Sequence, residues 1–232
     1  MTVVYLVGSD TKQALHALNG QNDRLVQDSM PALPGVGCES QFCSGTDLWS
    51  VSLAYAPDAK AISLVVSVAN VEVFRVWTAE GKVLDNSDSR GRSMPVWSGS
   101  SLYFRDAGGV EVWRGGAVSS FLPGVAWISP QASPAGGQLV YATKDAQGSH
   151  HVFVANTATG AAREIQKSRS RPVFLTSRYL WYRGERACVA SDNCPGGWSV
   201  VDNGHAYIYD LQIGTEYDSI ITNVYDAWPH AA

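Results

Sequence analysis

The sequence predicts an all-β protein with the fold of a five-bladed β-propeller, in which each blade is a sheet of four antiparallel strands. A phrase of roughly 47 residues recurs along the chain, and repeats of that length are typical of propellers. Each repeat begins with an apolar strand that ends near Trp or Phe, and two alternating strands joined by a Gly-bearing turn follow. The five anchors of the repeat are Asp47–Ser50, Met94–Ser98, Val125–Ser129, Arg171–Phe174 and Tyr225–Pro229.

The position of the last anchor predicts how the ring closes. Tyr225–Pro229 lies close to the C-terminus, whereas the first strands of the chain, beginning at Thr2, have no anchor of their own. We therefore expect the C-terminal strand to join the N-terminal blade as its inner strand. Closure of this kind leaves only short outer strand edges with unpaired backbone groups.

The whole chain, residues 1–232, is predicted to be a single propeller domain. Alternation of apolar and polar residues, as in Val71–Trp77, supports the strands, and Gly ends turns such as Asn156–Gly160. The segment Lys12–Leu18 also fits one or two helical turns, but we favour a strand there. The five expected blades span about 222–232 plus 1–30, 46–86, 93–122, 124–167 and 170–221. In the same order, their expected inner strands are Ile221–Trp228, Leu48–Ala54, Pro95–Trp97, Val125–Ile128 and Pro172–Leu175.

Two strand-entry turns resemble a known repeat. Ala56–Ile62 (APDAKAI) and Ser133–Tyr141 (SPAGGQLVY) are similar to the S-P-D-G-K-x-I-A-F repeats of TolB-like, WD40-like propellers. Ala59 stands where that motif has Gly and Ala135 where it has Asp, while the third blade has only Ser98–Ser101 at this turn. The resemblance implies an extracytoplasmic binding module of bacteria with no shared catalytic residues, and fold analogy alone assigns no function.

Composition excludes some classes of partner. The formal net charge is −4 and 16% of the residues are charged, without any run of Lys and Arg, so nucleic acid is not an expected partner. The longest apolar stretch, Ala61–Val71, is interrupted by polar residues and is too short for a membrane span. We expect a monomer. No leader pattern follows Met1, and we expect that an exported protein has lost its leader here.

The four cysteines form two close pairs, Cys38 with Cys43 and Cys188 with Cys194. Both pairs lie in loops, and we predict two short-loop disulfides, which persist only in oxidising compartments. The predicted location is therefore extracytoplasmic: periplasmic, secreted or on the cell surface. A zinc site made by all four thiolates is the alternative, but zinc ribbons favour a spacing of two residues between cysteines.

Strand parity predicts which end of the ring meets a partner. Connections between the second and third strands of a blade, and between blades, emerge at one end. The two longest connections, Asp28–Asp47 and Gly184–Gly204, both belong to that end and each holds a cysteine pair. Loops that a rigid scaffold presents often carry function, so we predict a protein or glycan partner there. The predicted ligand-binding residues are Arg90, Arg92, Arg169, Arg171, Asp192 and Trp198.

The tryptophans are predicted to be mostly structural. Trp49, Trp97, Trp127 and Trp228 belong to the anchors, and Trp77, Trp113 and Trp181 lie within alternating strands, where large rings fill the space between blades. Only Trp198, in an irregular loop, is a candidate exposed ring, and packing under its own loop is an equal alternative for it.

No catalytic, metal or cofactor site is predicted. The tandem His150 and His151 start a strand and should point to opposite faces, so they cannot chelate one ion together. The alternative function is a glycan-active hydrolase with two carboxylates at the channel mouth. Its candidate carboxylates are Asp47, Asp226, Glu39 and Asp192.

Overall fold

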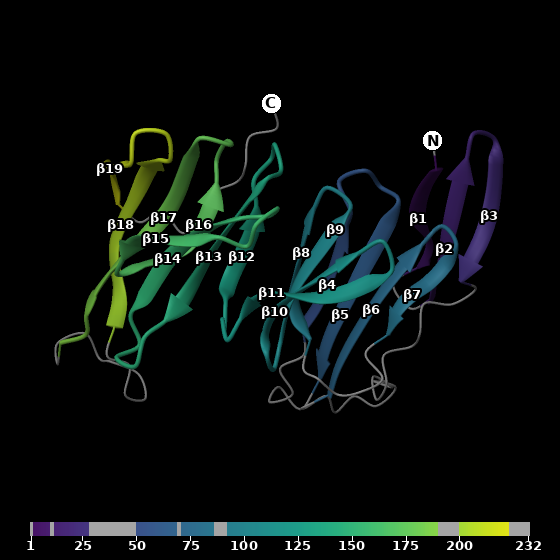
Figure 1. Cartoon of the computed structure of the whole chain (residues 1–232), viewed down its shortest axis with the longest axis horizontal. Coiled ribbons are helices and arrows are strands. Elements are labelled where there is room, and N and C mark those ends of the chain that lie inside the picture. Colours follow the sequence, from purple (N-terminus) through teal and green to yellow (C-terminus); the bar gives the residue numbers. More distant parts are fainter. Residues whose placement is uncertain are drawn as a thin grey trace. The chain divides into compact units, whose positions relative to one another are not determined.

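The computed structural model describes residues 2–9, 12–27, 50–68, 71–85, 92–189 and 200–222. These residues form five consecutive antiparallel sheets, and the strands of each sheet pair in their order along the chain (Figure 1). The chain divides into two compact units, residues 1–120 and 121–232. Within the described ranges no helix is long and apolar enough to cross a bilayer. The arrangement is a propeller-like all-β fold, as the sequence predicts.

The first unit contains three sheets. Its strands are β1 (Thr2–Ser9), β2 (Lys12–Asn19) and β3 (Asn22–Gln27); β4 (Ser50–Tyr55), β5 (Ala61–Val68), β6 (Val71–Thr78) and β7 (Gly81–Asp85); and β8 (Ser93–Ser98), β9 (Ser101–Asp106), β10 (Gly109–Arg114) and β11 (Ala117–Pro123), the last of which crosses the unit boundary. The segment that also fits a helix is therefore a strand, β2, and it pairs with β1 over its whole length.

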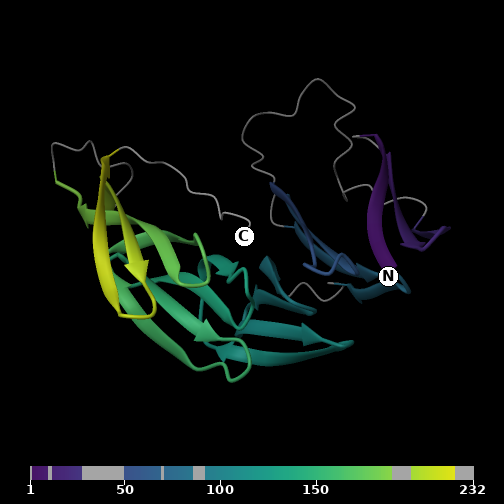
Figure 2. The same ribbon diagram turned by 90° about the horizontal axis from the view of Figure 1, so that it is seen from above.

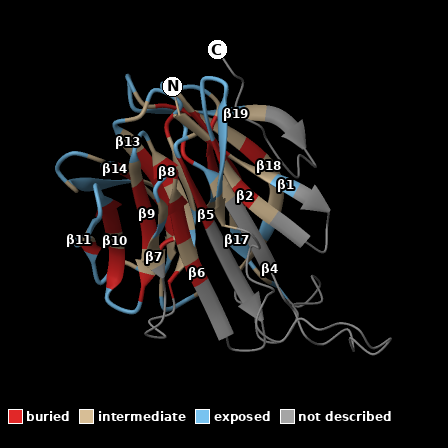
Figure 3. Cartoon of the chain, turned by 90° about the vertical axis from the view of Figure 1, so that its right-hand side faces the viewer, coloured by how far each residue is buried: buried red, intermediate tan, exposed pale blue. Residues whose placement is uncertain are grey.

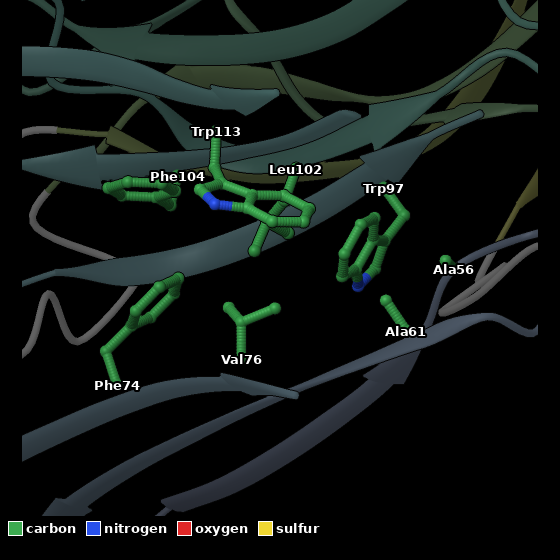
Figure 4. Close-up of a cluster of buried hydrophobic side chains, with 8 residues drawn as sticks. All are labelled: Ala56, Ala61, Phe74, Val76, Trp97, Leu102, Phe104 and Trp113. Carbon is green, nitrogen blue, oxygen red and sulfur yellow. The ribbon is translucent and has the colours of Figure 1, made fainter. Parts of the chain in front are cut away.

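Aromatic side chains fill the space between the second and third sheets. Phe74 of β6 lies 4.7 Å from Phe104 of β9, and Trp97 meets Trp113 edge-on at 6.1 Å, both measured between ring centroids (Figure 4). The indole of Trp97 donates a hydrogen bond of 3.0 Å to the buried hydroxyl of Ser63 on β5. Burial is concentrated on these strands (Figure 3). The core of this unit therefore lies between successive sheets, as it does between propeller blades.

The first and second sheets are also joined. Val4 of β1 packs in a cluster with Ile62 and Trp77 of the second sheet. Its backbone N–H donates to the carbonyl of Ala59 at 2.7 Å, and Arg24 of β3 donates to the carbonyl of Ala79. These contacts fix one sheet against the next by both apolar packing and hydrogen bonds.

The second unit contains the other two sheets, which lie side by side (Figure 1 and Figure 2). Val152, Phe174 and Tyr182 belong to the buried cluster between them. The strands are β12 (Ile128–Ala132), β13 (Gln138–Lys144), β14 (His150–Asn156) and β15 (Ala162–Lys167), followed by β16 (Arg169–Phe174), β17 (Tyr179–Ala187), β18 (Val200–Asp210) and β19 (Thr215–Thr222).

The first strands of the last three sheets share one irregularity. In β8, β12 and β16 the pairing with the next strand shifts by one residue, which marks a β-bulge. The residue in the bulge has a positive φ and precedes a proline in every case: Met94 at 50°, Ser129 at 48° and Arg171 at 51°. Positive φ is uncommon for residues other than Gly. Because it recurs at the same position in three sheets, the bulge is a regular feature of the fold.

The bulge corrects the predicted anchor of the fourth blade. The expected inner strand Val125–Ile128 is wrong, because β12 begins at Ile128 and ends at Ala132. The bulge aligns Ser129 with Met94, so Ala132 occupies the position that Trp97 has in β8. Trp127 is completely buried although it lies before the strand. Its indole lies 6.0 Å from the ring of Tyr141 on β13, measured between ring centroids, so an indole outside a strand can be buried as fully as one within it, and the repeat pattern does not distinguish the two.

The predicted burial of the tryptophans is confirmed for those within the described residues. Trp77, Trp97, Trp113, Trp127 and Trp181 are at most 6% exposed. The other three tryptophans and the C-terminal strand that would close the ring lie outside the described residues: Trp49, Trp198, Trp228 and Tyr225–Pro229. Closure therefore stays a prediction.

Candidate functional site

Three connections of the second unit emerge at the same end of its two sheets. They are the β13–β14 turn (145–149), Ser168 between β15 and β16, and the connection from β17 to β18, which begins at Cys188. Hydrogen bonds tie the first two of these connections to each other and to β17: the N–H of Glu185 in β17 donates to the carbonyl of Ser168 at 2.9 Å, and the hydroxyls of Ser149 and Ser168 lie 3.3 Å apart. We call this region the loop end. The connections that emerge at this end are the ones that the predicted strand parity assigns to it, so the prediction is confirmed within this unit.

The β13–β14 turn is held in shape by Asp145. Its carboxylate accepts hydrogen bonds of 2.9 Å from the backbone N–H groups of Gln147 and Ser149. An aspartate that caps the backbone two residues ahead is a common device of tight turns. Desolvation alone would raise the pKa of Asp145, but the hydrogen bonds from Ser149 and His151 outweigh it and hold the pKa below its usual value. The turn therefore carries a stable negative charge.

The tandem histidines diverge, as predicted, and each has its own carboxylate. The Nδ1 atom of His150 lies 2.6 Å from Glu185 of β17, and the backbone N–H of His150 donates to the other oxygen of that carboxylate at 3.0 Å. His151 instead lies between Asp145, at 3.2 Å, and Glu164, at 3.5 Å. His150 thus links the fourth sheet to the fifth, whereas His151 stays within the fourth.

Glu185 is almost buried, with 7% of its side chain exposed. Desolvation would raise its pKa, but hydrogen bonds from the side chain and backbone of His150, with a further one from Ser170, hold the pKa below the ordinary value. The ionised carboxylate is therefore the form that this part of the fold stabilises.

A second ionic network lies on the face of the fifth sheet that meets the fourth. Arg169 donates to the carboxylate of Glu216 through Nε at 3.0 Å and Nη2 at 2.6 Å, and the hydroxyl of Tyr182 donates to the same carboxylate at 2.5 Å. The guanidinium also covers the ring of Tyr207, with its carbon 3.9 Å from the ring centroid. Burial and the hydrogen bond to Glu216 raise the pKa of Tyr182, so the phenol stays protonated and acts as a donor.

Gly184 makes room for this network. A Cβ atom at this position would lie 2.6 Å from the ring of Tyr207 and 2.5 Å from the side-chain amide of Asn203. Only a residue without a side chain lets the Tyr207 ring lie close to β17 and still meet Arg169. The pairing continues along the strands, where Arg183 contacts Asp202 at 2.6 Å.

The structure brings two of the predicted ligand-binding residues to the loop end. Arg169 is occupied by Glu216, whereas Arg171 is exposed at the bulge of β16. Arg92, in the first unit, is 6% exposed, and its guanidinium lies over the ring of Phe104 and 3.5 Å from Glu111. All its described contacts are therefore internal. The remaining predicted ligand-binding residues, Arg90, Asp192 and Trp198, lie outside the described residues, as do the hydrolase candidates Asp47, Asp226 and Glu39.

Cys188 is the one cysteine in the described part of the chain, and it is not a free thiol. Cys194, its predicted partner, lies outside that part, together with Cys38 and Cys43. The two predicted disulfide pairings therefore stay predictions. Among the described residues no group of three or more His, Cys, Asp or Glu side chains is placed to hold a metal ion.

Sequence reasoning missed the partners of the predicted residues. Glu185, Glu216 and Tyr207 were not singled out, although each contacts a residue of the loop end or its network. Glu216 is separated from Arg169 by 47 positions and Glu185 from His150 by 35. The one available signal is the run Arg183–Arg186, where Gly and charged residues interrupt an otherwise apolar strand.

No protein-family model and no curated protein matches this chain. Solved structures do. The putative TolB from Agrobacterium tumefaciens has a TM-score of 0.51 at 14% identity, over 93% of this chain and 76% of that one. An oligogalacturonate lyase in complex with manganese has a TM-score of 0.54 at 11% identity, over 92% of this chain and 63% of the lyase. The tricorn protease has a TM-score of 0.52 at 14% identity, over 90% of this chain and 20% of the protease.

These likenesses establish the fold: the chain has a TolB-like propeller fold, as the two strand-entry turns predict. The chain spans less than two thirds of the lyase and a fifth of the protease. At identities this low the likeness concerns architecture alone, because one fold supports unrelated functions.

Proposed function

We propose that this chain is an extracytoplasmic, non-enzymatic binding module that recognises a protein partner through the loop end. In this proposal the five sheets form a closed ring, with the C-terminal strand as the inner strand of the first sheet. The TolB-like fold supports a binding role, since the resemblance in the strand-entry turns implies the same class of protein.

The observation that carries the proposal is the bracing of the loop end. His150 on β14 and Glu185 on β17 join the two sheets at 2.6 Å, and Ser168 bonds to Ser149 of the β13–β14 turn and to Glu185 of β17. A surface whose connections are already ordered loses little conformational entropy when a partner binds. The described part of the loop end therefore combines cross-braced turns with several polar groups, which suits recognition of another protein.

The described carboxylates of the second unit support binding over hydrolysis, while the hydrolase candidates Asp47, Asp226, Glu39 and Asp192 lie outside the described residues. A glycoside hydrolase needs two carboxyl groups that face its substrate. Within residues 121–189 and 200–222 every carboxylate already pairs with a basic side chain. The pairs are Asp145 with His151, Glu164 with Lys167, Glu185 with His150, Asp202 with Arg183, Asp210 with Arg178, Glu216 with Arg169 and Asp218 with His205.

The cysteine at the loop end supports an extracytoplasmic location. We propose that Cys188 pairs with Cys194 and that Cys38 pairs with Cys43. A short-loop disulfide at Cys188 would brace the connection from β17 to β18, directly after the strand that carries Glu185. Such bonds require an oxidising compartment.

Site-specific photocrosslinking tests the proposal. A photoreactive amino acid replaces Ala146, which is exposed in the β13–β14 turn, and in a matched control it replaces Ile213, which is exposed in the β18–β19 turn at the opposite end. We expect discrete crosslinked protein from the native envelope with the Ala146 variant only. Crosslinks from Ile213 alone would place the partner elsewhere, and binding of the wild-type chain to a glycan array without any protein crosslink would replace the protein partner with a glycan.

A further inference from the structure

Some charged side chains of the second unit have no partner among its described residues. Every carboxylate in its described residues is paired, but three cations have neither an ion pair nor a hydrogen bond to their charged groups: Lys144, Arg163 and Arg171. All three are exposed. The described part of the unit therefore leaves three exposed cations without a partner among the described residues, although the chain as a whole has a net charge of −4.

Two of these cations belong to the loop end. Lys144 ends β13 and is paired in the strand register with His150, the first residue of β14. Arg171 lies near the start of β16, directly after Ser170. Arg163 belongs to the opposite end, because it lies next to the β14–β15 turn, where it pairs with Val154.

A continuous chain of contacts connects the two loop-end cations across the sheets. Lys144 lies opposite His150, His150 contacts Glu185 at 2.6 Å, and Glu185 accepts a hydrogen bond from Ser170, the neighbour of Arg171. Since Glu185 is almost buried, this link is largely protected from solvent. His150 and Glu185 are thus positioning residues for the edge on either side of them.

Arg171 combines an unusual backbone conformation with an exposed side chain. Its φ of 51° lies in the left-handed region that non-Gly residues seldom adopt, and the following Pro172 has no N–H to donate. β-Bulges re-aim side chains at functional edges of sheets. The equivalent bulges hold Met94 and Ser129, so Arg171 is the one of the three that carries a charge.

We propose that Lys144 and Arg171 form a cationic edge of the loop end that binds the carboxylates of an acidic segment of the protein partner. Arg171 supplies planar donors suited to a bidentate carboxylate contact, and Lys144 supplies a point charge at the same end of the sheets. The inference rests on the proposed function, which places a protein partner at this end. Two isolated cations match a short acidic segment, whereas the negative net charge of the chain opposes an extended anionic surface such as a bilayer.

Fluorescence anisotropy with the full chain and a labelled octaglutamate peptide tests this edge, at 20 mM and 200 mM salt. The variants are Lys144→Ala, Arg171→Asn and the double variant; asparagine removes the charge but tolerates a positive φ, so the bulge persists. Arg163→Ala is the matched control, since it removes an equally free arginine at the other end. Circular dichroism and the melting temperature verify folding of each variant.

We expect each loop-end variant to weaken peptide binding about three- to tenfold, the double variant more than either, and added salt to weaken the wild type most. Arg163→Ala should stay within about 1.5-fold of the wild type. The edge is refuted if the wild type does not bind the peptide at 20 mM salt, if the double variant binds like the wild type, or if Arg163→Ala loses as much. Binding to anionic vesicles without binding to the peptide also overturns it. Crosslinking from Ala146 that survives the double variant would overturn the edge and leave the protein-binding function intact.

Discussion

Replacing Glu216 with alanine should destabilise the second unit, because the change removes a charge that three hydrogen bonds hold. The carboxylate accepts three hydrogen bonds, two from Arg169 and one from Tyr182. In the variant the guanidinium keeps the carbonyl of Ser168, at 3.0 Å, and the ring of Tyr207, but it loses its counter-ion. The hydroxyl of Tyr182 loses its acceptor in a buried position.

The magnitude follows from those losses. A hydrogen bond to a charged group contributes about 1.5–3 kcal/mol to stability, and breaking a fully buried ion pair costs about 3–5 kcal/mol. The side chains of Arg169 and Glu216 are 16% and 18% exposed, so solvent screening lowers the second figure. We expect a loss of about 2–4 kcal/mol, or roughly 6–12 °C in melting temperature for a chain of this length.

Urea unfolding followed by tryptophan fluorescence measures this loss, because Trp127 and Trp181 are buried in the same unit. Glu164→Ala is the matched control: its contacts, at 3.5 Å to His151 and 3.9 Å to Lys167, are long and partly exposed, so it should cost less than about 1 kcal/mol. A Glu216→Ala variant within about 0.5 kcal/mol of the wild type would refute the reasoning.

Three further predictions concern packing and pH. Gly184→Ala should lower the free energy of unfolding by about 1–3 kcal/mol in the same urea assay, because the new methyl group displaces Tyr207. Gly108→Ala is the control: its Cβ would meet its nearest atom at 3.4 Å, so it should stay within about 0.5 kcal/mol of the wild type. Phe74→Ala, at a fully buried position of the first unit, should cost about 3–5 kcal/mol by urea unfolding. The folded state lowers the pKa of Glu185, so the ionised carboxylate stabilises the fold fully above the ordinary pKa of 4.5. This contribution disappears as the pH falls through the folded-state pKa. The stability difference between the wild type and Glu185→Gln should therefore shrink on acidification from pH 6.

Each of these three predictions has an outcome that would contradict it. Equal losses for the two glycine variants would mean that the close approach at Gly184 is relieved without cost. A loss below about 1 kcal/mol for Phe74→Ala would contradict its role in the inter-sheet core. A stability gap that is constant between pH 6 and pH 3 would show that the ionisation of Glu185 does not contribute to folding.

Much of the fold was predictable because it depends on local patterns. Alternating apolar residues define strands wherever one face is buried, and Gly in the connecting turns satisfies a local backbone requirement. The strands of all five sheets were therefore identified, apart from their ends and the inner strand of the fourth blade. That strand was misplaced because the burial of Trp127 mimics an anchor, while the true register depends on the bulge at Ser129.

The location of the candidate site was predictable from the sequence, but the contacts of its residues were not. Strand parity located the loop end, since it depends on counting strands and on nothing else. It did not reveal that Arg169 is occupied by Glu216, or that Arg171 remains free beside it. Both arginines belong to the same short run of sequence, and pattern alone treats them alike.

The sequence by itself thus determined the succession of antiparallel strands, the positions of the turns and the burial of the large aromatic residues. Only the tertiary structure decided which charged side chains contact one another and which have no partner among the described residues. The physical reason is range: strand formation follows from the alternation of neighbouring residues, whereas an ion pair such as His150 with Glu185 exists only after two separate sheets have packed and set the distance between its atoms.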